Sequence, residues 1–303
     1  MIEQLRERYH NGGFYSIIHS VWDFIFLNWT GRFLKSLLGA RLHQKFQMYP
    51  RIGYWPQIRK PRTFNEKLMH RKLYTDNDFF TTVSDKWAVR EYVREQVGEE
   101  VLTKAYHITD DPATIPFDSL PPEYVIKPTH TSGGVTIVDL EDNPDRRDIR
   151  KHYKEYLNIK YGSVKSEYWY TNIKPRILIE ERLRGSDADI PRDYKFFVFY
   201  GEVEYIQVDL NRFDNHTRRL YDSEWNPQDF ELKFPIGPKT PEPTDLDQMI
   251  EIAECLGEGF DFIRIDLYQT ENGVIFGEMT VAPGSGGEMF RPIEYDFKMG
   301  SLW

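Results

Sequence analysis

Apolar and polar residues alternate along two short segments near the end of the chain, residues 262–270 and 274–281. Alternation with a period of two predicts β-strands. Residues 271–273 lie between them and end in a glycine, which can supply the positive φ of a tight turn. We therefore expect a hairpin with a three-residue loop, in which Thr270 pairs with Val274. Its apolar face would carry Ile263, Ile265, Leu267, Ile275, Met279 and Val281.

The other face of the predicted hairpin is polar. Asp266 would lie opposite Glu278, and Arg264 opposite Thr280. A register shifted by one residue would place Glu278 among apolar side chains, so the hydrophobic pattern favours the register that brings two carboxylates together. Carboxylates in direct cross-strand opposition repel each other. Either a bound cation such as Mg²⁺ or salt bridges from Arg264 on an exposed polar face would offset that repulsion.

Helical spacing of apolar residues dominates the first third of the chain. Residues 1–50 predict two or three aromatic-rich helices with a break at 29–31, before a proline-containing stretch. Thr63 and Glu66 match a capping box at the start of the next helix. Residues 84–98 predict a further helix that ends at Gly98.

The middle of the chain predicts strands and fewer helices. Strands are expected at 101–108, 124–127, 135–140 and 177–183, and a hairpin at 193–210 with its turn at 201–202. Helices are expected at 145–161 and 246–256, and residues 211–243 predict irregular structure.

Composition limits the class of partner. The chain of 303 residues has a net charge of −9, which argues against a general nucleic-acid binder. Its one cysteine, Cys255, excludes an intrachain disulfide. Residues 14–29 are apolar but too short to span a membrane, and they contain His19 and Asp23. A buried helix, a helix on a membrane surface and a partner contact all fit this segment. We expect a cytoplasmic protein, which would work at the inner face of the membrane if this segment lies on a membrane surface.

Several polar positions suggest phosphate chemistry. Thr131, Ser132, Gly133 and Gly134 lie between two predicted strands, where small residues leave backbone N–H groups open to phosphate oxygens. Lys127 ends the first of these strands. No GxxxxGK[ST] loop occurs, and an ordinary hairpin turn is the alternative. Further candidate ligand-binding residues are Lys86, Glu180, Glu181, Asp193 and Lys195. A solvated surface would equally explain these charged side chains.

The order of these motifs resembles the ATP-grasp superfamily. The motifs are SDK (84–86), YVIKPTHTSGG (124–134), ILIEERL (177–183), DYKFF (193–197), FIRIDLY (262–268) and GEMTVAPGSGG (277–287). Within the superfamily, FNEKL, SDKWAVREYV, VIKPTH and DYKFFVFYGE are most similar to the TupA-like branch, which is linked to teichuronopeptide and surface-polysaccharide synthesis. The resemblance spans roughly residues 60–290.

The resemblance implies an α+β fold in which two lobes with antiparallel sheets clamp ATP. A helical N-terminal segment, 1–62, would precede a lobe with the phosphate flap at 63–180 and a lobe with the metal site at 181–303. Many relatives instead begin with a Rossmann-like domain that helps to bind the acceptor.

The resemblance also implies residue roles. Lys86 and Lys127 would contact the ATP phosphates under a flap formed by residues 131–134. Asp266 and Glu278 would hold Mg²⁺, and Thr280 stands where many relatives have an asparagine as a further metal ligand. Arg264 would stabilise the transferring phosphoryl group or the later tetrahedral intermediate. The nucleotide's base and ribose would meet Glu180, Glu181, Leu183, Asp193 and Lys195.

The activity implied by the resemblance is an ATP- and Mg²⁺-dependent carboxylate–amine ligase that works through an acyl phosphate. Its carboxylate would be a uronic-acid-bearing glycan or precursor, and its amine an amino acid or peptide. A kinase of the same fold and a glycosyltransferase that uses a sugar nucleotide are the alternative enzymes. A non-catalytic scaffold at the membrane is a third alternative, which rests on residues 14–29.

Overall fold

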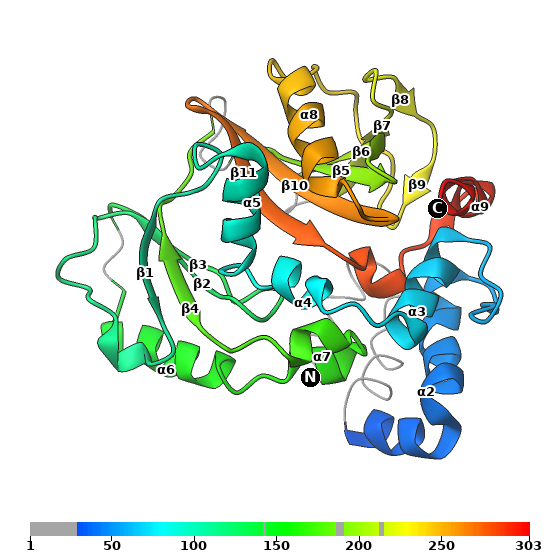
Figure 1. The fold of residues 1–303 in the computed structure, drawn as a ribbon, viewed down its shortest axis with the longest axis horizontal. Helices are drawn as coiled ribbons and strands as arrows, with labels where there is room; N and C mark the ends of the chain where they lie inside the picture. The colour runs from blue at the N-terminus through cyan, green and yellow to red at the C-terminus, as the bar shows by residue number, and fades with distance from the viewer. Residues whose placement is uncertain (1–28, 142–143, 186–190, 212–214) are drawn as a thin grey trace.

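Two antiparallel sheets organise the chain (Figure 1). The computed structural model describes residues 29–141, 144–185, 191–211 and 215–303. The small sheet has the strand order β1-β4-β2-β3, with β1 (Ala105–Thr109), β2 (Tyr124–Pro128), β3 (Thr136–Val138) and β4 (Ile177–Glu180). The large sheet has the order β11-β10-β5-β6-β7-β8, with β5 (Asp193–Phe199), β6 (Glu202–Leu210), β7 (Thr217–Tyr221), β8 (Pro227–Gln228), β10 (Phe262–Thr270) and β11 (Gly273–Thr280).

Helices cover the outer sides of the sheets and the end of the molecule near the C-terminus (Figure 1). The described helices are α2 (Trp29–Ile52), α3 (Phe64–Tyr74), α4 (Phe79–Ser84), α5 (Val89–Val97), α6 (Arg146–Tyr156), α7 (Tyr161–Lys165), α8 (Leu246–Gly257) and α9 (Glu294–Ser301). Short 3-10 turns occur at η1 (Pro112–Thr114), η2 (Tyr168–Thr171) and η3 (Pro283–Gly286), and β9 (Glu231–Leu232) pairs with β12 (Phe290–Arg291).

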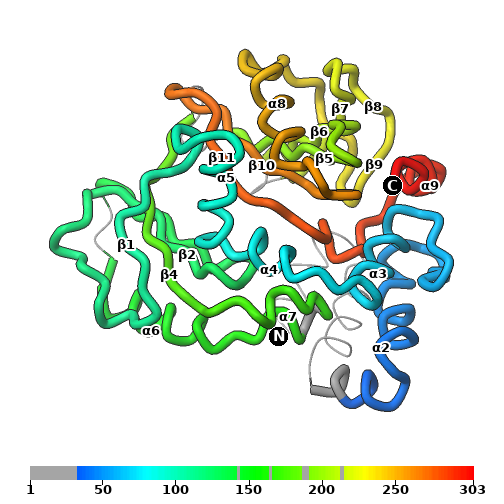
Figure 2. Tube along the Cα trace, in the orientation of Figure 1, coloured from blue at the N-terminus to red at the C-terminus, as the bar shows by residue number. Residues whose placement is uncertain are grey.

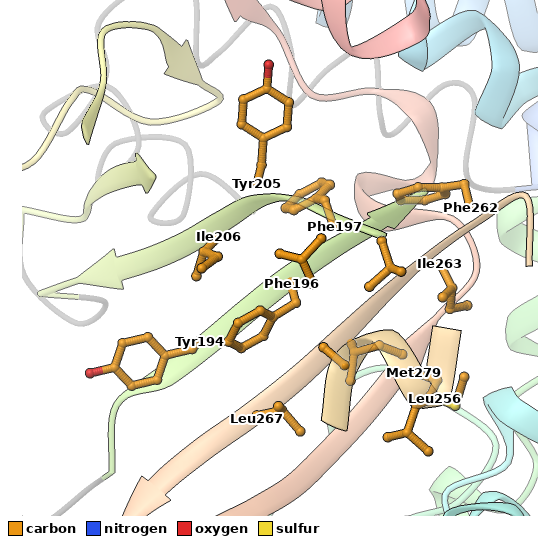
Figure 3. Packing of buried hydrophobic residues seen from close by; sticks show 14 of the residues in the cluster. Tyr194, Phe196, Phe197, Tyr205, Ile206, Leu256, Phe262, Ile263, Leu267 and Met279 are labelled. Atoms are coloured by element: carbon orange, nitrogen blue, oxygen red, sulfur yellow. The ribbon is translucent and has the colours of Figure 1, made fainter. Parts of the chain in front are cut away.

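The core of the large sheet is a row of apolar side chains that crosses four strands. The pairing aligns Met279, Ile265, Phe196 and Ile206, and all four are buried (Figure 3). Helix α8 packs against this side of the sheet so closely that a Cβ on Gly257 would lie 2.5 Å from Val198. Because side chains alternate along strands, the opposite side of the sheet is left for the polar positions.

The N-terminal and C-terminal parts of the described chain lie side by side, with α3 next to α9 (Figure 2). The backbone N–H of Asn65 donates to Asp296 Oδ1 at 3.0 Å, and its side-chain amide donates to Asp296 Oδ2 at 2.9 Å. The predicted capping box is confirmed, since Thr63 accepts from the N–H of Glu66 and the Glu66 side chain accepts from the N–H of Thr63. The end of α5 at Gly98 is confirmed as well.

The predicted hairpin register is confirmed at the carboxylates, but the predicted turn is wrong. Thr270 pairs with Gly273, so the loop has one residue fewer than expected. A bulge beside Gly277 adds one residue back and restores the pairing of Asp266 with Glu278. A Cβ at Gly277 would lie 3.0 Å from the carbonyl oxygen of Asp266 and 2.9 Å from the Tyr268 ring, so glycine is required at this bulge.

Two further expectations are wrong. Part of the supposedly irregular section 211–243 forms β7, a strand of the large sheet in which Arg218 and Arg219 are buried. The break expected at 29–31 lies inside α2, and the helix kinks instead at Gly39, where φ is +74°. No described helix is long and apolar enough to cross a membrane, and residues 14–28 lie outside the described residues.

Candidate active site

A cavity of about 350 Å³ is lined by strands of both sheets. Most of the residues singled out in the sequence meet there, because alternation turns one side of β2, β5, β10 and β11 toward it. The predicted residues in its lining are Lys86, Lys127, Glu180, Glu181, Leu183, Asp193, Lys195, Asp266 and Glu278. Residues 131–134, Arg264 and Thr280 are not in the lining, although each borders a residue that is.

The floor of the cavity is a row of charged side chains across three strands. Strand pairing aligns Glu278, Asp266 and Lys195. Asp266 is held by three bonds, from Arg264 Nε at 2.7 Å, Arg264 Nη2 at 2.8 Å and Lys195 Nζ at 2.6 Å. Lys195 also donates to Asp193 Oδ2 at 2.6 Å. Arg264 and Lys195 flank Asp266, and Arg264 also donates to Glu278, which offsets the repulsion between the two adjacent carboxylates.

The two opposed carboxylates differ in exposure. The Asp266 side chain is 3% exposed, whereas that of Glu278 is 44% exposed and faces the cavity. Burial disfavours the charged form of Glu278, but Arg264, Lys86 and Lys195 outweigh it and lower the pKa of this carboxyl. Burial likewise opposes the charge of Arg264, and Asp266 and Glu278 together raise its pKa above the ordinary value. Glu278 is therefore an ionised oxygen donor open to a ligand.

The donor set fits a hard divalent cation. Asp266 and Glu278 offer carboxylate oxygens, and Mg²⁺ is usually held by one or two carboxylates together with water and phosphate oxygens. Thr280 is less suited, since its hydroxyl donates to Glu278 at 3.1 Å and accepts from Arg264 at 3.1 Å. Among the described residues, no group of three or more His, Cys, Asp or Glu side chains surrounds one position. A cation here would need oxygens from its substrate.

The opposite wall of the cavity belongs to the small sheet. Lys127 on β2 forms a salt bridge with Glu180 Oε1 at the end of β4. Thr103 Oγ1 donates to Glu180 Oε2 at 2.8 Å, and Arg90 lies 3.8 Å from the same oxygen. Glu180 is thus a buried anchor that fixes the direction of the Lys127 ammonium.

Lys86 is not the solvated lysine that its sequence context allowed. It lies in the turn between α4 and α5, where Asp85 is fixed by Arg176 at 2.8 Å. Its Nζ donates to the carbonyl oxygen of Thr131 at 2.5 Å, and burial lowers the pKa of this ammonium. Lys86 therefore ties the turn to the loop that follows β2.

That loop, residues 131–134, connects β2 with β3 as predicted. Gly133 and Gly134 have φ values of +85° and +74°. Tyr153 on α6 donates to the carbonyl oxygen of Gly134 at 2.9 Å, and a Cβ on Gly134 would lie 2.4 Å from the Tyr156 ring. Helix α6 therefore anchors the end of the loop. The space around Gly133 is open, since a Cβ on this residue would meet no atom within 4 Å.

Sequence reasoning missed most of the apolar lining. Val125, Ile137, Tyr268 and Phe276 line the cavity together with the charged groups. Alternation could have identified Val125 and Tyr268, which stand two residues from Lys127 and Asp266 on the same strands. Phe276 stands two residues before Glu278, so the same alternation could have identified it as well.

The expected hinge after β4 is only partly open to a ligand. The N–H of Glu181 donates to the carbonyl oxygen of Lys104 at 2.9 Å, and its carboxylate accepts from the N–H of Lys104 at 2.7 Å. The N–H of Glu181 is therefore not available to a nucleotide base. Leu183 lines the cavity.

Fold and site together define an α+β protein whose two antiparallel sheets enclose a cavity lined by matched cations and carboxylates. The chain belongs to the TupA-like ATP-grasp family, whose model matches residues 66–303. The ATP-grasp fold implied by the sequence motifs is thereby confirmed.

The solved structures that match this chain are distant from it. A D-alanine–D-alanine ligase from Bacillus anthracis complexed with ATP has a TM-score of 0.41 and 13% identity, covering 73% of this chain and 63% of that one. An L-amino acid ligase from Bacillus licheniformis has a TM-score of 0.40 and 13% identity, covering 80% of this chain and 47% of that one. A third match is the ATP-grasp ligase PsnB complexed with a phosphomimetic variant of a minimal precursor, Mg and ADP. It has a TM-score of 0.39 and 13% identity, covering 89% of this chain and 70% of that one.

The chain spans about three fifths of the length of the D-alanine–D-alanine ligases that it matches. No curated protein sequence matches it.

Proposed function

We propose that this protein is an ATP- and Mg²⁺-dependent ligase that joins a carboxylate to an amine through an acyl phosphate. The observation that carries the proposal is the pairing of Glu278 with Asp266 on the cavity floor, opposite the Lys127 ammonium on the small sheet. Family membership supports ATP as the nucleotide. Bound Mg²⁺ would neutralise phosphate charge and align the phosphates for in-line transfer.

Each of the chain's own residues has a defined task in this proposal. Lys127 and Lys86 bind the ATP phosphates, and the loop 131–134 covers them and keeps out water that would hydrolyse the acyl phosphate. Arg264 stabilises the negative charge of the transferring group. Asp266 and Glu278 hold the metal, with Thr280 as a further expected contact. Asp193 and Lys195 lie near the ribose. The residues at the base are Glu180, Glu181 and Leu183.

The chemistry needs no side-chain nucleophile. The substrate carboxylate attacks the γ-phosphorus, the bond to the β-phosphate oxygen breaks, and ADP leaves. An amine then attacks the acyl carbon, phosphate leaves, and an amide remains. The protein contributes orientation and charge neutralisation. From the sequence resemblance to the TupA-like branch, which is linked to surface-polysaccharide synthesis, we propose a uronic-acid-bearing glycan or precursor as the carboxylate, an amino acid or peptide as the amine, and a cytoplasmic location.

A trapping experiment tests the reaction class. The protein is incubated with ATP, Mg²⁺ and a panel of uronic acids, with hydroxylamine as the amine. We expect a hydroxamate and one ADP for each hydroxamate formed. A phosphate ester detected by ³¹P NMR would instead identify a kinase. Protection from thermal unfolding by UDP-sugars, without protection by ATP, would favour a glycosyltransferase and would contradict the proposal.

A further inference from the structure

Residues 29–62 form a basic segment in an acidic chain. They include eight basic residues and no acidic one, although the chain as a whole has a net charge of −9. The next acidic residue, Glu66, is buried and accepts from the N–H groups of Gln57 at 2.6 Å and Arg62 at 2.8 Å. It therefore does not offset the charge at the surface of this segment.

Three of these cations converge on a cavity of about 260 Å³. Arg41 and Lys45 stand one turn apart on α2, and Arg59 comes from the loop that follows the helix. Within the part of the chain that the structure describes, none of the three takes part in an ion pair. Trp55 also lines the cavity, and the Lys45 ammonium lies 5.5 Å from its ring centroid. This chemistry fits a phosphate-type anion attached to an apolar group.

Exposed apolar side chains lie on the same helix and at the cavity. Leu42 and Trp55 belong to the cavity lining and are also exposed. Before the kink at Gly39, α2 presents Phe33 and Leu37, which are 65% and 71% exposed. Basic residues interleaved with exposed aromatic and aliphatic residues are typical of helices that lie in the interface of an anionic bilayer. A soluble polyanion would account for the cations but not for the apolar side chains.

The position of α2 in the fold leaves one part of it accessible while another part packs against the rest of the chain. The helix lies at the edge of the molecule, away from both sheets (Figure 1). Its second half packs beneath the turn after β11, where a Cβ on Gly287 would lie 2.8 Å from Met48 Sδ and 3.2 Å from Arg51 Cδ. We propose that α2 and the loop 53–62 bind the surface of a membrane that contains anionic phospholipid, with a lipid phosphate in the cavity of Arg41, Lys45 and Arg59. This surface is separate from the ligase chemistry.

Vesicle flotation of the full chain tests the surface. The probes are vesicles of phosphatidylcholine alone and of phosphatidylcholine with about a quarter of phosphatidylglycerol. We expect binding to the anionic vesicles only, and loss of binding at high salt because salt screens exposed charges. The variant Arg41→Gln/Lys45→Gln/Arg59→Gln should bind about a hundredfold more weakly, or about fivefold for each cation removed. Phe33→Ser/Leu37→Ser should also weaken binding but leave its salt dependence intact.

A matched control removes the same number of charges elsewhere. Arg147→Gln/Lys151→Gln/Lys154→Gln neutralises three exposed cations on α6 and should change binding less than about threefold. Equal binding to both vesicle types, equal loss in the control, or binding of soluble polyphosphate without binding of anionic vesicles would overturn the proposal. If a variant fails to fold, the salt dependence of vesicle binding by the wild-type chain still tests the proposal. ATP binding is measured in parallel, so that failure of the membrane proposal is distinguished from failure of the ligase proposal.

Discussion

Cations are arranged in opposite ways in the cavity between the sheets and along α2. In the cavity, Lys127 and Lys195 each contact a buried carboxylate, and Arg264 at its border bridges the buried Asp266 and the partly exposed Glu278. Along α2, Arg41 and Lys45 make no ion pair within the described residues. The same residue types therefore serve to fix geometry in one region and to present net charge in the other.

The difference follows from the cost of burying charge. A buried charge that loses its partner leaves the other charge uncompensated, which costs several kcal/mol, about 3–5 in measured cases. An exposed cation stays hydrated and contributes little to folding. Substitutions in the two regions should therefore have very different effects on activity and on the free energy of unfolding. The following predictions test that contrast, from the largest expected effect to the smallest.

Asp266→Asn should reduce turnover about a thousandfold. The change removes a carboxylate from the proposed metal site and leaves Arg264 and Lys195 without their shared partner. The measurement is the hydroxamate assay, with circular dichroism to confirm folding. The control, Asp247→Asn, changes an exposed carboxylate on α8. Activity within about threefold of wild type would refute the metal assignment.

Arg71→Met should destabilise the fold by about 3–5 kcal/mol, which extends the contrast to a buried cation outside the cavity. Arg71 donates to the carbonyl oxygens of Phe262 at 2.9 Å and Val281 at 2.8 Å and pairs with Asp261. Methionine fills similar space but leaves these acceptors unsatisfied. Urea unfolding measures the loss.

The control for Arg71 is Arg94→Met, at an exposed arginine whose partners are the exposed Glu91, three residues earlier on the same helix, and Glu99. It should cost about 0.5 kcal/mol or less. Equal losses for the two variants would mean that burial does not distinguish these cations.

Lys127→Ala should weaken ATP binding about tenfold to a hundredfold. The alanine removes the cation and leaves Glu180, a buried carboxylate, facing the proposed phosphate position. Isothermal titration with ATP and Mg²⁺ gives the affinity. Lys104→Ala, at an exposed lysine, is the control. Wild-type affinity in Lys127→Ala would count against the placement of the phosphates beside β2.

Glu278→Gln should alter the dependence of stability on pH. The pKa of Glu278 is lowered in the folded state from its ordinary 4.5, although burial opposes this, because Arg264, Lys86 and Lys195 favour the ionised form. Its contribution to stability is therefore present above the ordinary pKa and is lost as the pH falls through the lower folded-state value. The difference in Tm between wild type and variant should be greatest near neutral pH and should shrink below about pH 4.5. A difference that stays constant from acid to neutral pH would contradict the assignment.

Arg41→Gln/Lys45→Gln/Arg59→Gln should have the smallest effect on folding. Because the three cations make no ion pair among the described residues, we expect the free energy of unfolding to change by no more than about 0.5 kcal/mol for each cation removed. Urea unfolding checks this. A loss comparable to that of Arg71→Met would mean that the cations of α2 stabilise the fold rather than present charge.

Much of the site could be predicted because its pattern is local. Period-two alternation on two strands was enough to place Asp266 opposite Glu278, and that pairing is observed even though the predicted turn is one residue too long. The bulge at Gly277 compensates for the shorter turn, and its contacts with Asp266 and Tyr268 exist only once the strands are paired. The motif order of the sequence likewise identified the ATP-grasp fold, which the family match confirms.

Long-range contacts decided what the sequence left open. Strand β7 lies in the section 211–243, whose sequence predicts irregular structure, and Arg218 on this strand is buried and pairs with Asp209 at 2.6 Å on the neighbouring strand. Lys86 acquires its place from Thr131, which is 45 residues away. The sequence by itself determined that Asp266 and Glu278 share a strand face and that α3 begins after Thr63, since those features depend on near neighbours. Only the tertiary structure decided which charges are matched and which remain exposed, because a charge's partner and its access to water depend on segments far away in the chain.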